Sequence, residues 1–238
     1  NYTRSDQYRD NNDYKLDSSS INFSTINDAG VYKYLKLKKF EEDIRLPGGI
    51  NLATYFSNPK TTNEPQSFAR EELASFELGY HDLYINDLKT NGSVSFSTKQ
   101  TTSYFDSVWG DSSYRYTYDT LQGYKKGQLK YNLFNNPTVL NIGVDFYNSD
   151  YSDKSLIGSY YKRTSEQLTF DPWLIGQMFF GHGYDLEAGI RHHFYKLNVY
   201  DETTSKQKLH EKSSNVNAWS VGGTKKIDEK NIFNMKLS

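Results

Sequence analysis

The sequence predicts an all-β fold, and more narrowly a segment of an antiparallel, up-and-down transmembrane β-barrel. The composition favours strands over helices or disorder, because 16% of the 238 residues are aromatic, 21 of them Tyr, while only 36% are hydrophobic. Several segments alternate apolar and polar residues with the period of two that is typical of a strand. Short turns and longer polar connections also alternate along the chain, as they do in membrane barrels.

Four alternating segments follow one another, and each predicts a strand with one apolar face and one polar face. The residues that share an apolar face are Val94 and Phe96; Leu129, Tyr131 and Leu133; Leu140, Ile142, Val144 and Phe146; and Leu186, Ala188, Ile190 and Phe194. In a soluble sandwich the polar faces would meet bulk water, whereas in a large barrel they would meet a wet lumen and the apolar faces would meet lipid. The face pattern alone fits both architectures.

The connections favour the barrel. Clusters rich in Asn, Asp, Gly and Pro predict tight turns at residues 27–30, 84–89, 135–138, 181–184 and 227–231. Between them we expect long loops at residues 41–71, 104–116, 149–165 and 201–214. Strict alternation of short and long connections is typical of a barrel with short periplasmic turns and longer extracellular loops. We therefore expect about eleven strands and a single barrel segment over residues 1–238.

Strand length and aromatic placement support the same prediction. Residues 117–134 and 185–200 are longer than the usual 5 to 6 residues of a soluble strand and suit tilted membrane strands of about 9 to 11 residues with extensions. Aromatic residues gather near the segment ends, where a girdle at the membrane interface would lie. They are Tyr80, Tyr84, Phe134, Phe179, Phe180, Tyr195 and Tyr200. Aromatic residues are also good strand residues in general, so this feature fits both readings.

Charge and missing motifs exclude several classes of function. The net charge is -1, with 28 basic and 29 acidic side chains mixed along the chain, so no basic stripe predicts nucleic-acid binding. The absence of Cys excludes thiolate catalysis and zinc-cysteine sites. The sequence contains no catalytic or phosphate-binding motif. We therefore predict no enzymatic activity and no cofactor.

Two groups of residues are weak candidates for other chemistry. His182 lies in a turn, and His192 and His193 are neighbours in a strand, so their side chains point to opposite faces and do not share one metal ion. The paired acids at residues 41–42 and 71–72 would suit a glycosidase, which needs two carboxylates close together, but we interpret them as solvated loop charge. We predict no metal site.

Five short stretches, taken together, resemble successive landmarks in a known family. They are "YRDNNDY" (8–14), "RLPGGINLATYFSNP" (45–59), "NIGVDFY" (141–147), "DLEAGIRHHFY" (185–195) and "AWSVGGTKKIDEKNIFNMKLS" (218–238). Their order and spacing resemble the barrel of TonB-dependent outer-membrane receptors of the siderophore and ferric-citrate type. The resemblance implies a Gram-negative outer-membrane receptor that takes up a metal chelate. It also implies two partners, outer-membrane lipid and the TonB energy-transducing complex, which acts through a plug domain.

The sequence departs from the family pattern in three ways. It shows no TonB-box-like start, no plug domain, and no terminal aromatic residue, since it ends in Lys236, Leu237 and Ser238. About eleven strands are half of a plugged transporter barrel of about 22 strands. A half barrel would expose two strand edges, whose unpaired backbone groups are costly in a bilayer. We therefore expect the first half of a barrel.

Aromatic and basic residues in the expected long loops are the candidate ligand-binding residues. Aromatic rings offer stacking surface, and Arg binds carboxylate or phosphate oxygens in a bidentate manner. The candidates are Arg45, Trp109, Tyr114, Arg115, Tyr160, Tyr161 and Arg163. If the receptor resemblance holds, these residues would bind a ferric siderophore or ferric citrate. A soluble or surface-attached all-β binding module, such as an adhesin or lectin, is the alternative function, and a secreted glycosidase fragment is a third.

Overall fold

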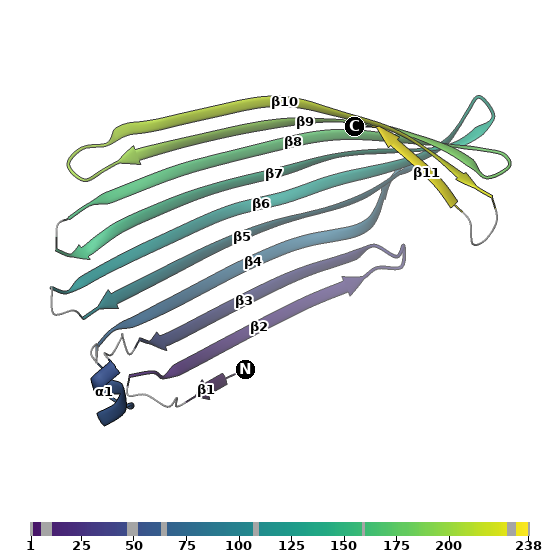
Figure 1. The fold of residues 1–238 in the computed structure, drawn as a ribbon. Coiled ribbons are helices and arrows are strands. Elements are labelled where there is room, and N and C mark those ends of the chain that lie inside the picture. The colour runs from purple at the N-terminus through teal and green to yellow at the C-terminus, as the bar shows by residue number, and fades with distance from the viewer. Residues whose placement is uncertain are drawn as a thin grey trace.

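The structure is a computed structural model that describes residues 2–5, 11–46, 52–62, 66–106, 110–158, 160–227 and 232–237. Within these residues eleven antiparallel strands form one sheet in strict chain order, with a short helix after the third strand (Figure 1). The elements are β1 (Tyr2–Ser5), β2 (Tyr14–Ile26), β3 (Tyr32–Arg45), α1 (Leu52–Ser57), β4 (Phe68–Ile85), β5 (Leu88–Phe105), β6 (Ser112–Leu133), β7 (Asn136–Ile157), β8 (Lys162–Phe180), β9 (Tyr184–Asp201), β10 (Gln207–Lys226) and β11 (Ile232–Leu237). The predicted all-β meander of about eleven strands is confirmed.

The tight turns gather at one end of the sheet. Turns lie at the predicted positions 27–30, 84–89 and 181–184, whereas the turn predicted at 135–138 lies at residues 134–135, because β7 begins at Asn136. All four turns are at the right-hand end in Figure 1. Each of the four turns contains left-handed backbone: Gly30 has φ of 76° and Asn86 has φ of 55°, Phe134 and Asn135 have φ of 50° and 62°, and His182 and Gly183 have φ of 65° and 77°. The turn predicted at 227–231 lies largely outside the described residues.

The connections at the other end are shorter than we expected. Strand β6 begins at Ser112 and β7 ends at Ile157, so most of 104–116 and 149–165 is strand, and β10 begins at Gln207 within the expected loop 201–214. The polar, Tyr-rich composition of these ranges favoured loops. However, a strand is held by backbone hydrogen bonds to its neighbours, which do not require apolar side chains. The longest connection, 46–67, carries α1.

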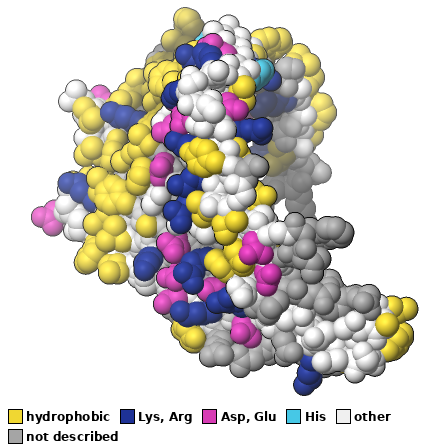
Figure 2. Space-filling model, turned by 90° about the vertical axis from the view of Figure 1, so that its left-hand side faces the viewer, with side chains coloured by type: hydrophobic (Ala, Val, Ile, Leu, Met, Phe, Trp, Pro, Cys, Tyr) yellow, Lys and Arg dark blue, Asp and Glu magenta, His cyan; other side chains and the backbone are white. Residues whose placement is uncertain are grey.

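The sheet has one apolar face and one polar face. Cross-strand partners share a face, and one row on the apolar face joins Ile142 of β7, Leu174 of β8 and Ile190 of β9. The next row, on the polar face, joins Gly143, Trp173 and Arg191. In Figure 2 hydrophobic side chains gather along the left side of the molecule, whereas charged side chains gather over its middle.

No second layer covers the apolar face in the part of the chain that the structure describes. Only Val31 and Tyr34 are buried hydrophobic side chains there, while Ile142 is 52% exposed, Ile190 53% and Trp219 60%. A sandwich would bury such residues between two sheets. The sandwich architecture is therefore not the one the chain adopts. No helix among the described residues is long and apolar enough to cross a membrane.

The sheet is open, because β1 pairs only with β2 and β11 only with β10 within the described residues. Each outer strand therefore has one free edge in this chain. We call the face that carries Trp173 and Arg191 the polar face, and the face that carries Ile142, Leu174 and Ile190 the apolar face.

Candidate functional site

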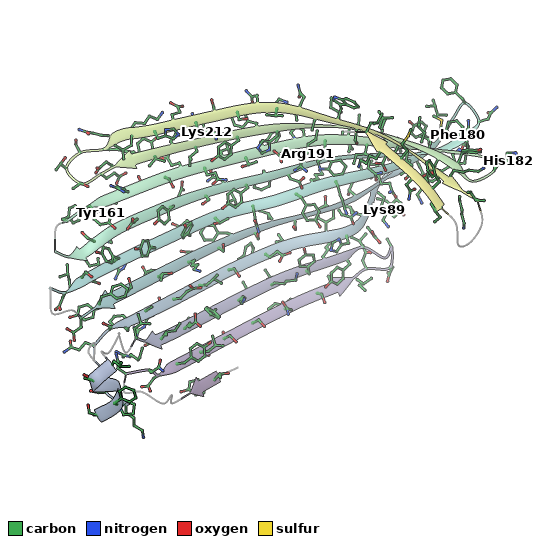
Figure 3. The ribbon with its side chains drawn as sticks, viewed as in Figure 1. Lys89, Tyr161, Phe180, His182, Arg191 and Lys212 are labelled. Atoms are coloured by element: carbon green, nitrogen blue, oxygen red, sulfur yellow. The ribbon has the colours of Figure 1, made fainter. Side chains whose placement is uncertain are left out.

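A cluster of tyrosines occupies the polar face at the end of the sheet with the longer connections. We call it the tyrosine patch and define it as Tyr114, Tyr116 and Tyr118 of β6, Tyr151 and Asp153 of β7, Tyr161 before β8, and Arg163 of β8. The three β6 tyrosines alternate in sequence and so share a face. Figure 3 shows Tyr161 at this end of the sheet, with Arg191 midway along β9 and Phe180 and His182 at the opposite end.

Strand register brings the members of the patch together. Tyr118 pairs with Tyr151, Tyr116 pairs with Asp153, and Asp153 pairs with Arg163. The ring centroids of Tyr118 and Tyr151 are 4.6 Å apart, and those of Tyr116 and Tyr151 are 6.5 Å apart. These separations lie within the range of favourable aromatic contacts. The patch is therefore a continuous aromatic surface on β6 and β7.

Tyr161 links this surface to the charged groups beside it. Its hydroxyl donates a hydrogen bond of 3.0 Å to Asp153 Oδ1, and its ring centroid lies 6.3 Å from that of Tyr114. The guanidinium of Arg163 lies 5.8 Å from the centroid of the Tyr161 ring. Desolvation and the bond to Asp153 raise the pKa of Tyr161 to about 12. At neutral pH Tyr161 is therefore protonated and donates to the carboxylate.

A second set of polar contacts holds the connection after β9 against β8. Lys162 forms an ion pair with Glu202, and the hydroxyl of Thr164 donates to Glu202 Oε1 at 3.0 Å. Hydrogen bonds from these two residues lower the pKa of the Glu202 carboxyl. Asp201 accepts a 2.8 Å bond from the backbone N–H of Thr203 and is the register partner of Arg163. Arg163 thus lies between two acidic strand neighbours, Asp153 and Asp201.

The structure brings together three of the seven predicted ligand residues, Tyr114, Tyr161 and Arg163. Arg115 follows Tyr114 in β6 and so points to the opposite face. Arg45 lies at the end of β3, also on that opposite face, with its guanidinium 5.5 Å from the ring centroid of Phe68. Arg45 and Arg115 therefore do not join the patch. Tyr160 is 57% exposed in the connection before β8, and Trp109 lies outside the described residues.

Sequence reasoning missed Tyr118, Tyr151 and Asp153. Tyr118 shares the parity of Tyr114 and Tyr116, so the alternation in "YRYTY" (114–118) was a signal that pointed to it. Tyr151 and Asp153 join the patch through the pairing of β6 with β7, which composition does not reveal. Both residues had been placed in an expected loop.

A second polar cluster lies midway along the same face. Asp171 of β8, only 6% exposed, accepts a 2.6 Å bond from Arg191 Nη2, and its Oδ1 is 2.7 Å from His193 Nδ1. Asp145 of β7 accepts a 3.2 Å bond from the indole N–H of Trp173, and its Oδ2 is 3.5 Å from Arg191. The cluster ties three neighbouring strands together.

The histidines behave as their positions predict. His193 contacts Asp171 on the polar face, whereas His192 lies on the apolar face with its Nδ1 2.7 Å from Asn217 Oδ1. No group of three His, Asp or Glu side chains that could hold a metal ion occurs among the described residues. The polar face therefore offers stacking surface, phenol hydroxyls and guanidinium groups for a ligand.

No protein-family model matches the chain, and no curated protein matches it. Solved structures do match. The unliganded ferric citrate transporter FecA has a TM-score of 0.72 at 13% identity over 96% of this chain, and the ferric-catecholate import receptor Fiu from E. coli K12 has a TM-score of 0.71 at 11% identity over 96%. The alcaligin outer-membrane receptor FauA from Bordetella pertussis has a TM-score of 0.70 at 12% identity, again over 96%.

These matches define the class of fold. The chain has the fold of part of a TonB-dependent receptor barrel, with eleven strands of its meander. More particularly, the matching barrels belong to ferric citrate and siderophore receptors, which are transport proteins and not enzymes. The chain spans 36% of the first of these proteins, 47% of the second and 35% of the third, which is less than half the length of each.

Proposed function

We propose that the chain is part of the barrel of a Gram-negative outer-membrane receptor that takes up a metal chelate, either a ferric siderophore or ferric citrate. The observation that supports this most strongly is the division of one sheet into two faces. An exposed apolar band crosses the strands on one face, and the tyrosine patch lies at the end of the other. A sheet of this kind suits hydrocarbon on one side and a wet lumen on the other.

The apolar band has the length that a bilayer requires. On β8 the apolar-face residues run from Leu168 to Met178, with Phe170, Pro172 and Leu174 between them. This is a span of about eleven residues, as a membrane strand tilted near 45° needs. Beyond Leu168 the same face continues with Glu166 and Thr164. We place the longer connections outside the cell and the tight turns in the periplasm, as in barrels of this class.

The tyrosine patch provides what an anionic chelate needs for capture. Its rings present flat surface for a planar ligand such as a catecholate, and Arg163 offers donors to carboxylate oxygens. Arg163 lies 5.8 Å from the centroid of the Tyr161 ring, so its guanidinium and the aromatic surface are next to each other.

Transport would need an energy source, because an outer membrane holds no nucleotide supply of its own. The receptor fold supports coupling to the TonB complex through a plug domain outside this chain. The chain itself then contributes lumen wall and ligand contacts and performs no covalent chemistry.

The soluble adhesin or lectin module is the less supported alternative. In water the apolar band would form a large exposed hydrophobic surface, which soluble monomers avoid. Exposed members of the band include Phe96, Phe170 and Leu186. A soluble module would need another protein layer over this face.

The test is ligand binding by the complete protein, expressed in a Gram-negative host and extracted from the outer membrane in mild detergent. Ferric citrate and a ferric catecholate are titrated while intrinsic fluorescence is followed. We expect each of the substitutions Tyr151→Ala and Arg163→Gln to lower the affinity for the preferred chelate about tenfold or more, as loss of a binding hot spot does. Tyr104→Ala is the matched control, because Tyr104 lies at the same end on the opposite face. Equal binding by all variants, or no chelate binding, would contradict the proposal.

A further inference from the structure

The carboxylate of Asp153 lies among the rings of the tyrosine patch. Asp153 is the register partner of Tyr116 on β6, and Tyr151 precedes it by two residues on the same face of β7. Its Oδ1 accepts the 3.0 Å hydrogen bond from the hydroxyl of Tyr161. Phenol rings from β6, from β7 and from the residue before β8 therefore lie around one acid.

No basic side chain of the described residues pairs with this acid. Asp153 forms no ion pair there, and its only printed hydrogen-bond partner is a neutral phenol. Arg163, its register partner on β8, instead places its guanidinium 5.8 Å from the centroid of the Tyr161 ring. Lys99 lies on the same face of β5 but forms an ion pair of 2.8 Å with Glu71. The negative charge of Asp153 is therefore open to a ligand.

The charge balance at this end of the polar face is negative. Arg163 has Asp201 of β9 as its other register partner, so two carboxylates accompany one guanidinium and leave one negative charge uncompensated. Hydrogen bonds from Thr203 lower the pKa of the Asp201 carboxyl, which is therefore ionised at neutral pH. Burial, followed by the charge of Asp153, raises the pKa of Tyr151 to about 12, so this phenol stays neutral.

Aromatic rings and a carboxylate together favour a cationic group. The face of a tyrosine ring attracts an ammonium electrostatically, and a carboxylate adds a charge-assisted hydrogen bond. A ligand carboxylate placed at Asp153 would instead meet a like charge, which disfavours binding. Arg163 can bind an anionic oxygen beside it, because cross-strand side chains lie about 5 Å apart. The site thus presents an acid and a base to the same ligand.

We infer that the ligand of the tyrosine patch is a ferric siderophore that carries a free ammonium group besides its anionic iron-binding oxygens. The ammonium lies against the ring of Tyr151 and pairs with Asp153, while an anionic oxygen of the ligand meets Arg163. The inference rests on the proposed function and narrows it. Ferric citrate has no ammonium group, so it is not the preferred chelate.

The test compares chelates that differ only in the ammonium group. The complete protein, extracted from the outer membrane in mild detergent, is titrated with a linear ferric trihydroxamate that ends in a primary amine and with the same chelate after acetylation of that amine. Ferric citrate and a ferric catecholate without an amine are titrated in parallel. We expect the amine form to bind most tightly and its acetylation to lower the affinity about tenfold or more.

The outcomes separate this inference from the receptor proposal. If any chelate without an amine binds as tightly as the amine form, the inference is wrong and the receptor proposal stands. If no ferric chelate binds, both fall.

A substitution of the acid tests the site itself. Asp153→Asn keeps a hydrogen-bond acceptor for Tyr161 but removes the charge, so we expect the amine form to lose about tenfold or more in affinity and the acetylated form to bind as before. Asp150→Asn is the matched control, because Asp150 lies on the same strand but pairs with Asp119 on the opposite face. Equal losses for both forms of the chelate in Asp153→Asn would show a structural role for the acid and overturn the inference.

Two substitutions of Tyr151 separate its ring from its hydroxyl. Tyr151→Phe keeps the ring, so it should bind the amine form as the wild type does. Tyr151→Leu removes the ring, and we expect it to lower the affinity for the amine form about fivefold more than that for the acetylated form. An unchanged preference for the amine in Tyr151→Leu would contradict the contact between the ammonium and this ring.

Discussion

The indole of Trp173 in β8 covers Gly143, its register partner in β7, and leaves no room for a side chain there. The indole N–H is thereby directed at Asp145 Oδ2, 3.2 Å away. Asp145 Oδ2 also lies 3.5 Å from Arg191, so the Trp173 ring that packs on Gly143 also contacts the polar cluster. A glycine in the middle of a strand is otherwise unfavourable, so its presence here reflects the ring above it.

Gly143→Ala should lower the stability of the protein, because the added methyl group overlaps the Trp173 ring and displaces it from Asp145. We expect a loss of about 1–3 kcal/mol, as for other overpacked sites. Thermal unfolding in detergent, followed by the shift of electrophoretic mobility on heating, measures the change. Gly176→Ala is the control, because the nearest atom to its methyl group would be 3.9 Å away. Equal losses in both variants would refute the packing argument.

Asp171→Asn should destabilise the strands β8 and β9. The substitution leaves Arg191 and His193 beside a group that no longer carries a negative charge, and loss of a charged hydrogen-bond partner costs about 1–3 kcal/mol. Denaturant unfolding in detergent provides the measurement. Asp150→Asn serves as control, since Asp150 is exposed and faces Asp119 and Glu166 across the strands. We expect this control to be neutral or slightly stabilising.

Tyr161 should titrate well above the ordinary tyrosine pKa of 10.0. Its folded-state pKa of about 12 exceeds the ordinary value of 10.0, so the folded protein holds this proton more tightly than the unfolded chain does. The resulting stabilisation is complete below pH 10 and disappears as the pH rises through about 12. The difference in tyrosinate absorbance between the wild type and Tyr161→Phe reports this titration. A difference curve centred near pH 10 would contradict the contact with Asp153.

Phe134→Asn should stabilise the protein in detergent. Phe134 holds a φ of 50°, which costs a non-glycine residue about 1 kcal/mol, whereas Asn accepts this conformation in two-residue hairpin turns. Phe134 is also 83% exposed, as a ring at a membrane interface would be. We therefore expect a smaller gain, or none, when unfolding is measured in lipid vesicles. The same gain in both media would argue against an interfacial role for this ring.

The sequence predicted the fold well where side chains alternate sharply. Residues 140–146 and 186–194 form strands with the expected faces, because an apolar side chain at every second position fits a sheet with one apolar face. The tight turns were equally predictable, since Asn and Gly favour the left-handed backbone that such turns need. The sequence predicted β6 and β7 to be shorter than they are, because the composition of the half of each strand far from the tight turns is polar and resembles that of a loop.

The site was predicted only in part, because the register between neighbouring strands determines which residues lie side by side. Tyr114 and Arg115 are adjacent in sequence, yet they lie on opposite faces of β6. Tyr151 and Asp153 join the patch only through pairing with Tyr118 and Tyr116. Composition identifies aromatic and basic residues near the strand ends, but it does not determine which of them share a face across neighbouring strands.

The central claim is that hydrocarbon covers the apolar face, and the tryptophans test it directly. Trp219 lies on the apolar face and is 60% exposed, whereas Trp173 lies on the polar face. Two variants, each retaining one of these tryptophans and carrying Phe in place of the others, are reconstituted in vesicles with brominated acyl chains. We predict strong quenching of Trp219 by the lipid and weak quenching of Trp173. Equal quenching of Trp219 and Trp173 by the brominated lipid would contradict the account. It would also be contradicted if Trp219 were quenched by acrylamide from the aqueous phase and not by the lipid.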